Sequence, residues 1–181
     1  MSPRRATFLA VLLSTLNLAA CREDHPPIAL AENVDLQRFM GDWYVIANIP
    51  TRIEREAWGA VESYRLEPDG TIATTFTFRK GGFDGERKEY NPRGFVKPGT
   101  GNAVWGMQFV WPVKADYRIA YLDDDYTLTV IGRQARDYVW IMARQPAIPD
   151  EDYRRILGFL AGQGYDVAKI QKVPQRWEAT P

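Results

Sequence analysis

The feature that most constrains the fold is a period-two alternation of apolar and polar residues, repeated in short runs between residues 34 and 145. Such alternation places side chains on opposite faces of a β-strand, and turn residues separate the runs. The turns, such as Glu67-Pro68-Asp69-Gly70, favour antiparallel hairpins. The strands are expected at about 43–49, 58–67, 71–79, 86–96, 103–111, 115–122, 126–133 and 137–145. We therefore predict an all-β fold: an eight-stranded antiparallel up-and-down β-barrel, either filled by side chains or able to hold one small ligand.

Short helical elements flank the predicted barrel. Residues 34–40 form an apolar lead-in that predicts a helical turn before the first strand. After the last strand, Pro149-Asp150-Glu151-Asp152 is typical of a helix start, and an apolar stripe of period 3.6 follows it. We expect this C-terminal α-helix to end near Gly162 or Gly164 and to pack on the outside of the barrel. A short strand near residues 166–173 is expected to complete the domain.

The N-terminal residues carry targeting information rather than fold. Arg4 and Arg5 precede an apolar stretch that is too short for a transmembrane helix. It ends in Leu18-Ala19-Ala20-Cys21, which resembles a bacterial lipobox. The resemblance implies a signal peptide over residues 1–20 and lipid attachment at Cys21, which would tie the protein to a membrane. The alternative is an ordinary signal peptide in which Cys21 is incidental.

Domain limits follow from the same pattern. Residues 21–33 include Pro26 and Pro27 and predict a lipidated tether, residues 34–174 a barrel domain, and residues 175–181 a tail. Arg22 stands where the common inner-membrane retention signal has aspartate. Resemblance to the sorting rules of Gram-negative bacteria therefore implies the outer membrane, with the protein anchored on its periplasmic side.

The composition argues against several classes of function. The chain has 23 basic and 23 acidic residues, and its basic residues form no stripe, so we expect no nucleic-acid partner. The one histidine, His25, lies in the tether, and Cys21 is the only cysteine. We therefore expect no disulfide, no metal site, no cofactor and no catalytic triad, and we predict that the protein is not an enzyme. The acidic run at 123–125 is expected in a turn.

Three motifs stand in order along the barrel sequence: Gly41-Asp42-Trp43-Tyr44 at the first strand, Asp124-Asp125-Tyr126 in a late turn, and Arg144 at the end of the last strand. They resemble the motifs of the lipocalin family, most closely in its bacterial outer-membrane form. The second has aspartate where the family has threonine, so it lacks that hydroxyl. In lipocalins the tryptophan plugs one end of the barrel and the arginine packs across it. The resemblance implies that Gly41, Trp43, Asp125, Tyr126 and Arg144 close the barrel.

Alternation carried from Trp43 and Arg144 predicts which side chains face the lumen. The predicted wall is apolar and aromatic, with tyrosine hydroxyls as its few polar groups, and this suits an acyl chain with a modest polar head. Its residues are Val45, Ala47, Ile72, Thr74, Phe76, Phe78, Trp105, Met107, Phe109, Trp111, Tyr117, Ile119, Tyr121, Tyr138, Trp140 and Met142. Ile53 and Trp58 either line the mouth or belong to a lid.

The resemblance to bacterial lipocalins implies the function. It implies a fatty acid or lysophospholipid ligand that is stored or transported for maintenance of the cell envelope. The alternative is a structural or assembly lipoprotein whose filled barrel acts through protein contacts. A homodimer is a further alternative that the residues leave open.

Overall fold

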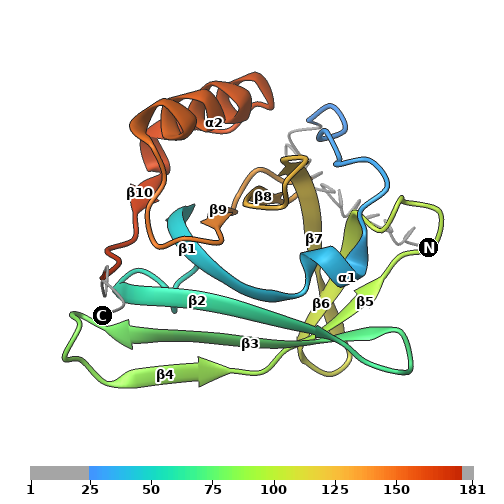
Figure 1. The fold of residues 1–181 in the computed structure, drawn as a ribbon, viewed down its shortest axis with the longest axis horizontal. Coiled ribbons are helices and arrows are strands. Elements are labelled where there is room, and N and C mark those ends of the chain that lie inside the picture. Colours follow the sequence, from blue (N-terminus) through green and yellow to red (C-terminus); the bar gives the residue numbers. More distant parts are fainter. Residues whose placement is uncertain (1–24, 177–181) are drawn as a thin grey trace, which may run out of the picture.

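The strands pair in chain order until the last one returns to the first. The computed structural model describes residues 25–176. Strand β1 (Gly41–Ile49) pairs with β9 (Val139–Ala143), and this pairing closes the antiparallel sheet (Figure 1). The other strands are β2 (Ala57–Leu66), β3 (Thr71–Lys80), β4 (Arg87–Tyr90), β5 (Arg93–Val96), β6 (Val104–Val110), β7 (Val113–Leu122), β8 (Leu128–Gly132) and β10 (Gln171–Lys172). The predicted eight-stranded barrel is confirmed, because β4 and β5 share one position and β10 is a two-residue addition.

The fourth position of the barrel differs from the prediction of one strand over residues 86–96. Strand β4 pairs with the far half of β3 and β5 with its near half, and Asn91-Pro92 separates them. Proline has no amide N–H to donate to the sheet. Its carbonyl instead accepts from the Thr74 amide at 3.1 Å, so the strand bends here without leaving the barrel.

Two of the register shifts in the sheet reverse the alternation that the sequence predicts in β1 and β7. One lies between Val45 and Ala47 against β9, and the other between Ile119 and Tyr121 against β8. An extra residue in a strand moves every later side chain to the opposite face. Ala47 and Tyr121 were therefore wrongly predicted to face the lumen: both pack in the cluster outside the barrel.

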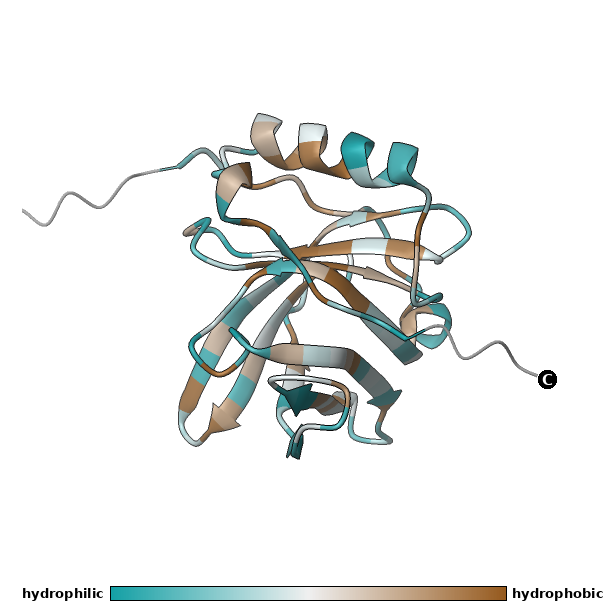
Figure 2. Cartoon of the chain, turned by 90° about the vertical axis from the view of Figure 1, so that its left-hand side faces the viewer, coloured by the Kyte–Doolittle hydropathy of each residue, from teal (hydrophilic) through white to brown (hydrophobic). Residues whose placement is uncertain are grey.

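Two apolar cores lie on either side of the sheet. The inner core gathers Trp43, Ile72, Trp105, Ile119 and Met142 inside the barrel. The outer core lies under α2 (Asp150–Gly162), whose buried residues Ile156 and Leu160 belong to the predicted stripe. Figure 2 shows this helix lying across the outside of the strands, as expected. No helix within residues 25–176 is long and apolar enough to cross a bilayer.

The chain before β1 runs along the barrel from one end to the other. The Ala31 amide donates to the Ile119 carbonyl at 2.9 Å and the Val34 amide to the Gly101 carbonyl at 2.9 Å. Helix α1 (Leu36–Phe39) follows, capped by the Asp35 carboxylate. Part of the segment expected as a tether thus packs on the fold, while the signal peptide, Cys21 and residues 177–181 lie outside the described residues.

The C-terminal strand expected near residues 166–173 is mostly a different structure. Residues Val167–Lys169 form the 3-10 helix η1, and only Gln171 and Lys172 add β10 to the edge of β1. The Asp166 carboxylate caps η1 by accepting from the Ala168 amide. Local capping therefore prevails here over strand propensity.

Candidate functional site

Trp43 closes one end of the barrel. Its side chain is fully buried, and its indole Nε1 donates to the Phe39 carbonyl of α1 at 2.9 Å. The Arg144 guanidinium carbon lies 3.9 Å from the centroid of the Trp43 ring, in the cation–π contact expected from the family motif. Such a contact contributes about 0.5–2 kcal/mol, depending on how far the charge is removed from water.

Arg144 also donates hydrogen bonds to backbone carbonyls of three segments. Its Nη2 donates to the carbonyls of Arg38, Phe39 and Met40 at 2.8, 3.1 and 2.8 Å. Its Nη1 donates to the Asp42 carbonyl at 2.8 Å and its Nε to the Tyr126 carbonyl at 3.2 Å. Gly41 lies beside it with φ of +93°, a conformation that favours glycine. This arginine therefore ties α1, β1 and the β7–β8 turn together.

The β7–β8 turn is held by a residue that the family motif does not include. The Asp123 carboxylate accepts from the amides of Thr127 and Leu128 at 2.7 and 2.9 Å. Tyr126 has φ of +59°, and its hydroxyl accepts from the Asp35 amide at 2.8 Å. Asp125 is exposed. The sequence motif points to Asp125 in this turn, whereas the Asp123 carboxylate makes these hydrogen bonds.

An aromatic layer lies above Trp43 and forms the floor of the lumen. Phe39 lies 5.0 Å from Trp43 and 5.6 Å from Trp105, and Trp105 stacks on Tyr117 at 5.3 Å between ring centroids. The hydroxyls of Tyr64 and Tyr117 are hydrogen-bonded to each other. This half of the barrel is therefore filled.

A cavity of about 360 Å³ occupies the other half. Its volume lies within the range of small-molecule sites, about 300–1,000 Å³. Six of the predicted lumen residues line it: Phe76, Met107, Phe109, Tyr117, Tyr138 and Trp140. Of the other predicted residues, Val45, Ile72, Trp105, Ile119 and Met142 pack in the inner core below it, and Phe78 lines a hollow beside the mouth.

The prediction for the end of the strand expected at 103–111, observed as β6, is wrong. Trp111, expected to point inward, lies at the tip of the β6–β7 hairpin with 82% of its surface exposed. Phe109, Val110 and Val113 next to it are also exposed. The register between β6 and β7 shifts after Met107. The tip of the β6–β7 hairpin therefore projects away from the barrel wall.

The loop between β1 and β2 folds over the mouth. The Glu54 carboxylate accepts from the Trp140 indole N–H at 2.7 Å and from the Thr51 amide at 2.8 Å. Ile53 lines the cavity, whereas Trp58 packs edge-on against Phe83 outside it, at 5.0 Å between centroids. Of the two residues left open from the sequence, Ile53 therefore lies at the mouth and Trp58 does not.

A second carboxyl lies deeper in the cavity. Glu62 on β2 pairs across the sheet with Trp43 and Phe76, and its side chain is 8% exposed. Burial raises the pKa of Glu62 to about 7; the Tyr64 hydroxyl lowers it and the charge of Glu54 raises it further. No lumen-facing residue was predicted on β2, although alternation with Ala60 and Tyr64 places Glu62 inward.

Other hollows and clusters do not form a comparable site. A polar hollow of about 700 Å³ lies outside the barrel, between Tyr44, Val61 and Arg79, beside the last described residues. Within residues 25–176, no group of three or more His, Cys, Asp or Glu side chains is arranged to hold a metal ion.

Comparison with known proteins agrees with this geometry. Residues 34–175 match the family described as Lipocalin-like domain. The chain belongs to the lipocalin family. Lipocalins are binding proteins and are generally not enzymes, so the cavity of this lipocalin is its candidate ligand site.

Relatives in bacteria and plants cover nearly the whole chain. It is 29% identical over 184 residues to the outer membrane lipoprotein Blc of Escherichia coli K12, covering 95% of this chain and 98% of the relative. It is 30% identical over 158 residues to temperature-induced lipocalin-1 of Arabidopsis thaliana, covering 81% and 82%. Among solved structures, insecticyanin from the tobacco hornworm Manduca sexta has a TM-score of 0.66 at 15% identity, covering 86% of this chain and 87% of that one. The last likeness shows the fold alone.

Proposed function

We propose that this lipocalin is a membrane-anchored carrier that binds a lipid in its barrel cavity, for storage or transport in the bacterial envelope, without catalysis. The observation that carries the proposal is the partly filled barrel: a closed floor of aromatic side chains below a cavity with apolar walls. Phe76, Met107 and Trp140 offer contact along an acyl chain, as in a fatty acid or lysophospholipid.

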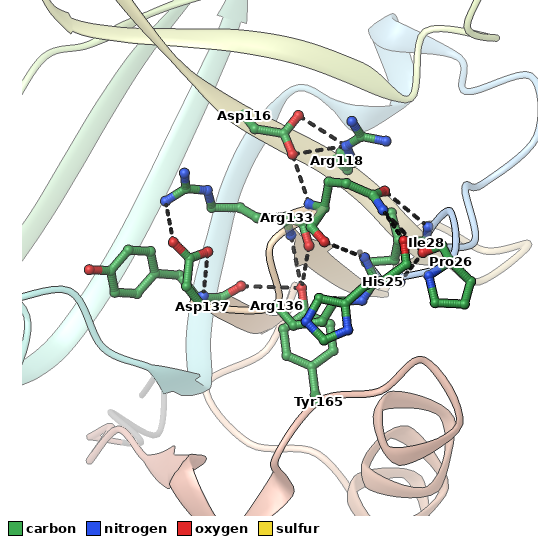
Figure 3. Close-up of polar contacts among 11 residues, drawn as sticks. His25, Pro26, Ile28, Asp116, Arg118, Arg133, Arg136, Asp137 and Tyr165 are labelled. Carbon is green, nitrogen blue, oxygen red and sulfur yellow. Dashed lines mark hydrogen bonds and ion pairs between the residues drawn. The ribbon is translucent and has the colours of Figure 1, made fainter. Parts of the chain in front are cut away.

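The N-terminal segment supports an anchor near the mouth. Gln134 and Arg136, in the loop between β8 and β9, donate to the Pro26 carbonyl at 3.1 and 2.7 Å (Figure 3). This loop lies at the same end of the barrel as the cavity, because Arg133 and Tyr138, at the two ends of the loop, line the cavity. His25 is the fourth residue after Cys21, and the chain between the two can span at most about 14 Å when extended. A lipid on Cys21 would therefore hold the mouth close to the bilayer surface.

The exposed β6–β7 hairpin supports the same orientation. Phe109 contributes to the cavity wall, and Val110, Trp111 and Val113 continue from it into solvent. Tryptophan and other apolar side chains partition into the interface of a bilayer. A mouth that rests on the bilayer would cover this apolar tip and would let a lipid enter without crossing water.

The relatives and the N-terminal sequence support a location in the outer membrane. Three bacterial relatives from Escherichia coli and Citrobacter freundii are named outer membrane lipoproteins. Together with Arg22 after the lipobox cysteine, they support lipid anchorage in the outer membrane, on its periplasmic side. A homodimer and a purely structural role are the alternatives.

The test is to purify the full chain from membranes and identify the lipids that remain bound by mass spectrometry. We expect a stoichiometric amphiphile in the wild type and its loss in Met107→Arg, which places a charge in the cavity. Gln108→Arg puts the same side chain on the opposite face of β6 and is the matched control. Ala115→Trp, which fills the cavity from β7, serves if Met107→Arg fails to fold.

The same preparations are titrated with a fluorescent amphiphile. Saturable binding that both cavity variants lose supports the carrier. A well-folded wild type that neither retains a lipid nor binds the probe would overturn the proposal in favour of a scaffold, and conversion of the bound lipid would show an enzyme.

A further inference from the structure

Glu62 is a buried carboxyl without a cationic partner. Its side chain is 8% exposed, and it faces the cavity from the middle of β2. None of the ion pairs within residues 25–176 includes it. The neighbouring Glu54, by contrast, is satisfied by two N–H donors. Glu62 is thus a buried carboxyl of the cavity that has no cationic partner within residues 25–176.

Of the two arginines that line the cavity, Arg133 is engaged with other groups and Arg52 lies nearer the mouth. Arg133 pairs with Asp137 at 3.2 Å and lies over the Tyr138 ring, 5.3 Å from its centroid. Asp116 pairs with Arg118 at 2.9 Å. The groups that face Glu62 directly are Tyr64 on its own strand, Tyr117 on β7 and Glu54 in the loop, and each either is acidic or carries no charge near neutral pH. Arg52, Asp116 and Arg133 complete the charged lining nearer the mouth.

A carboxylate removed from water is costly unless a cation or several donors replace the solvent. A ligand that brings a second carboxylate or a phosphate to this depth would add repulsion between like charges. A ligand that brings an ammonium group would supply the missing counter-ion. The apolar walls at Phe76, Met107 and Trp140 continue from Glu62 toward the exposed Phe109, so a hydrocarbon chain can extend from the ammonium to the mouth.

Resting on the proposed carrier function, we propose that Glu62 is a specificity-determining residue that selects amphiphiles with an ammonium group, bound with that group at the deep end of the cavity. Tyr64 and Tyr117 lie close enough to orient the carboxyl, and their hydroxyls are bonded to each other. A fatty acid bound in this direction would meet Glu62 with its own carboxylate.

The proposal predicts a pH dependence. Burial raises the pKa of Glu62 to about 7, so the carboxyl is largely neutral at pH 6 and largely ionised at pH 8. Affinity for an alkylammonium should rise over this interval, and affinity for a fatty carboxylate should fall. A long-chain alcohol, which is neutral throughout, should respond much less.

The experiment titrates the full chain, freed of retained lipid, with dodecylammonium, dodecanoate and dodecanol at pH 6 and pH 8 by calorimetry. At pH 8 we expect dodecylammonium to bind at least about tenfold more tightly than dodecanoate. Glu62→Gln should remove this preference and its pH dependence while dodecanol still binds. Glu56→Gln, which changes an exposed carboxylate in the loop over the mouth, is the matched control and should behave as the wild type.

The outcomes separate the two proposals. Equal affinity for dodecylammonium and dodecanoate in the wild type would overturn the inference and leave the carrier function standing. A preference that survives Glu62→Gln and disappears in Glu54→Gln would overturn the assignment to Glu62. Failure to bind any of the three probes would overturn the carrier function itself.

Discussion

The two ends of the barrel differ in how far their polar groups are hydrogen-bonded. At the closed end, polar groups are matched: Arg144 donates to five carbonyls, and the Trp43 indole donates to Phe39. At the open end, Thr51 Oγ1 and Arg133 Nε are buried without hydrogen-bond partners, and Glu62 has no counter-ion. The hairpin tip there exposes apolar side chains. The closed end therefore supplies rigidity, whereas the open end leaves unsatisfied groups available for a ligand or a membrane.

Removing Trp43 should destabilise the closed end more than any other change considered below. Trp43→Ala removes a fully buried side chain together with its contacts to Phe39 and Arg144. We expect the free energy of unfolding to fall by about 3–5 kcal/mol in urea denaturation. Trp111→Ala at the exposed tip is the control and should change it by less than about 0.5 kcal/mol. Similar losses in both variants would contradict the division between the two ends.

The next effect tests the open end through pH. Because burial raises the pKa of Glu62 from 4.5 to about 7, the folded state holds its proton more tightly than the unfolded state does. The resulting stability is fully present below pH 4.5 and is lost as the pH rises to 7, by about 3 kcal/mol in total.

Glu62→Gln keeps the shape of the side chain and cannot ionise. Its free energy of unfolding should therefore exceed that of the wild type by about 3 kcal/mol at pH 8, with the advantage gone near pH 4.5. Urea denaturation across this range measures both. A wild type and a variant that respond equally to pH would show that Glu62 is well solvated or paired.

A smaller effect distinguishes charge from geometry at Arg144. Lysine keeps the positive charge but lacks the planar fork that reaches several carbonyls at once. Arg144→Lys should lower the free energy of unfolding by about 1–3 kcal/mol, because carbonyls of α1 lose their donor. The measurement is thermal and urea unfolding, with Arg87→Lys on the exposed β4 as the control. An unchanged stability would mean that only the charge over Trp43 matters.

Much of the closed end was predictable because its residues stand in sequence motifs. Trp43 precedes the bulge in β1, and Arg144 follows β9, whose pairing with β8 has no register shift. The alternation that places both residues inward is therefore intact. Asp123 was missed because the neighbouring Asp124-Asp125-Tyr126 matched the family pattern, and sequence gives no way to see which of three consecutive carboxylates reaches the amides of Thr127 and Leu128.

The open end was less predictable for two physical reasons. A bulge leaves no mark in the hydrophobic pattern, so Ala47 kept an apparent inward parity that the register against β9 reverses. The same error at Tyr121, near the closed end, comes from the register shift against β8. On β2, the outward Val61 is apolar and the inward Glu62 is charged, which inverts the pattern that marks a buried face. Functional sites are where such local rules break.

The pairing of β1 with β9 also determines when this protein can fold. Tyr44 meets Ala143 only after almost the entire barrel sequence has been made, and Arg144, which fastens α1, arrives later still. Folds dominated by pairings between distant residues form slowly. A newly made chain should therefore acquire its rigid end last, after the residues of β9 and Arg144 have been added.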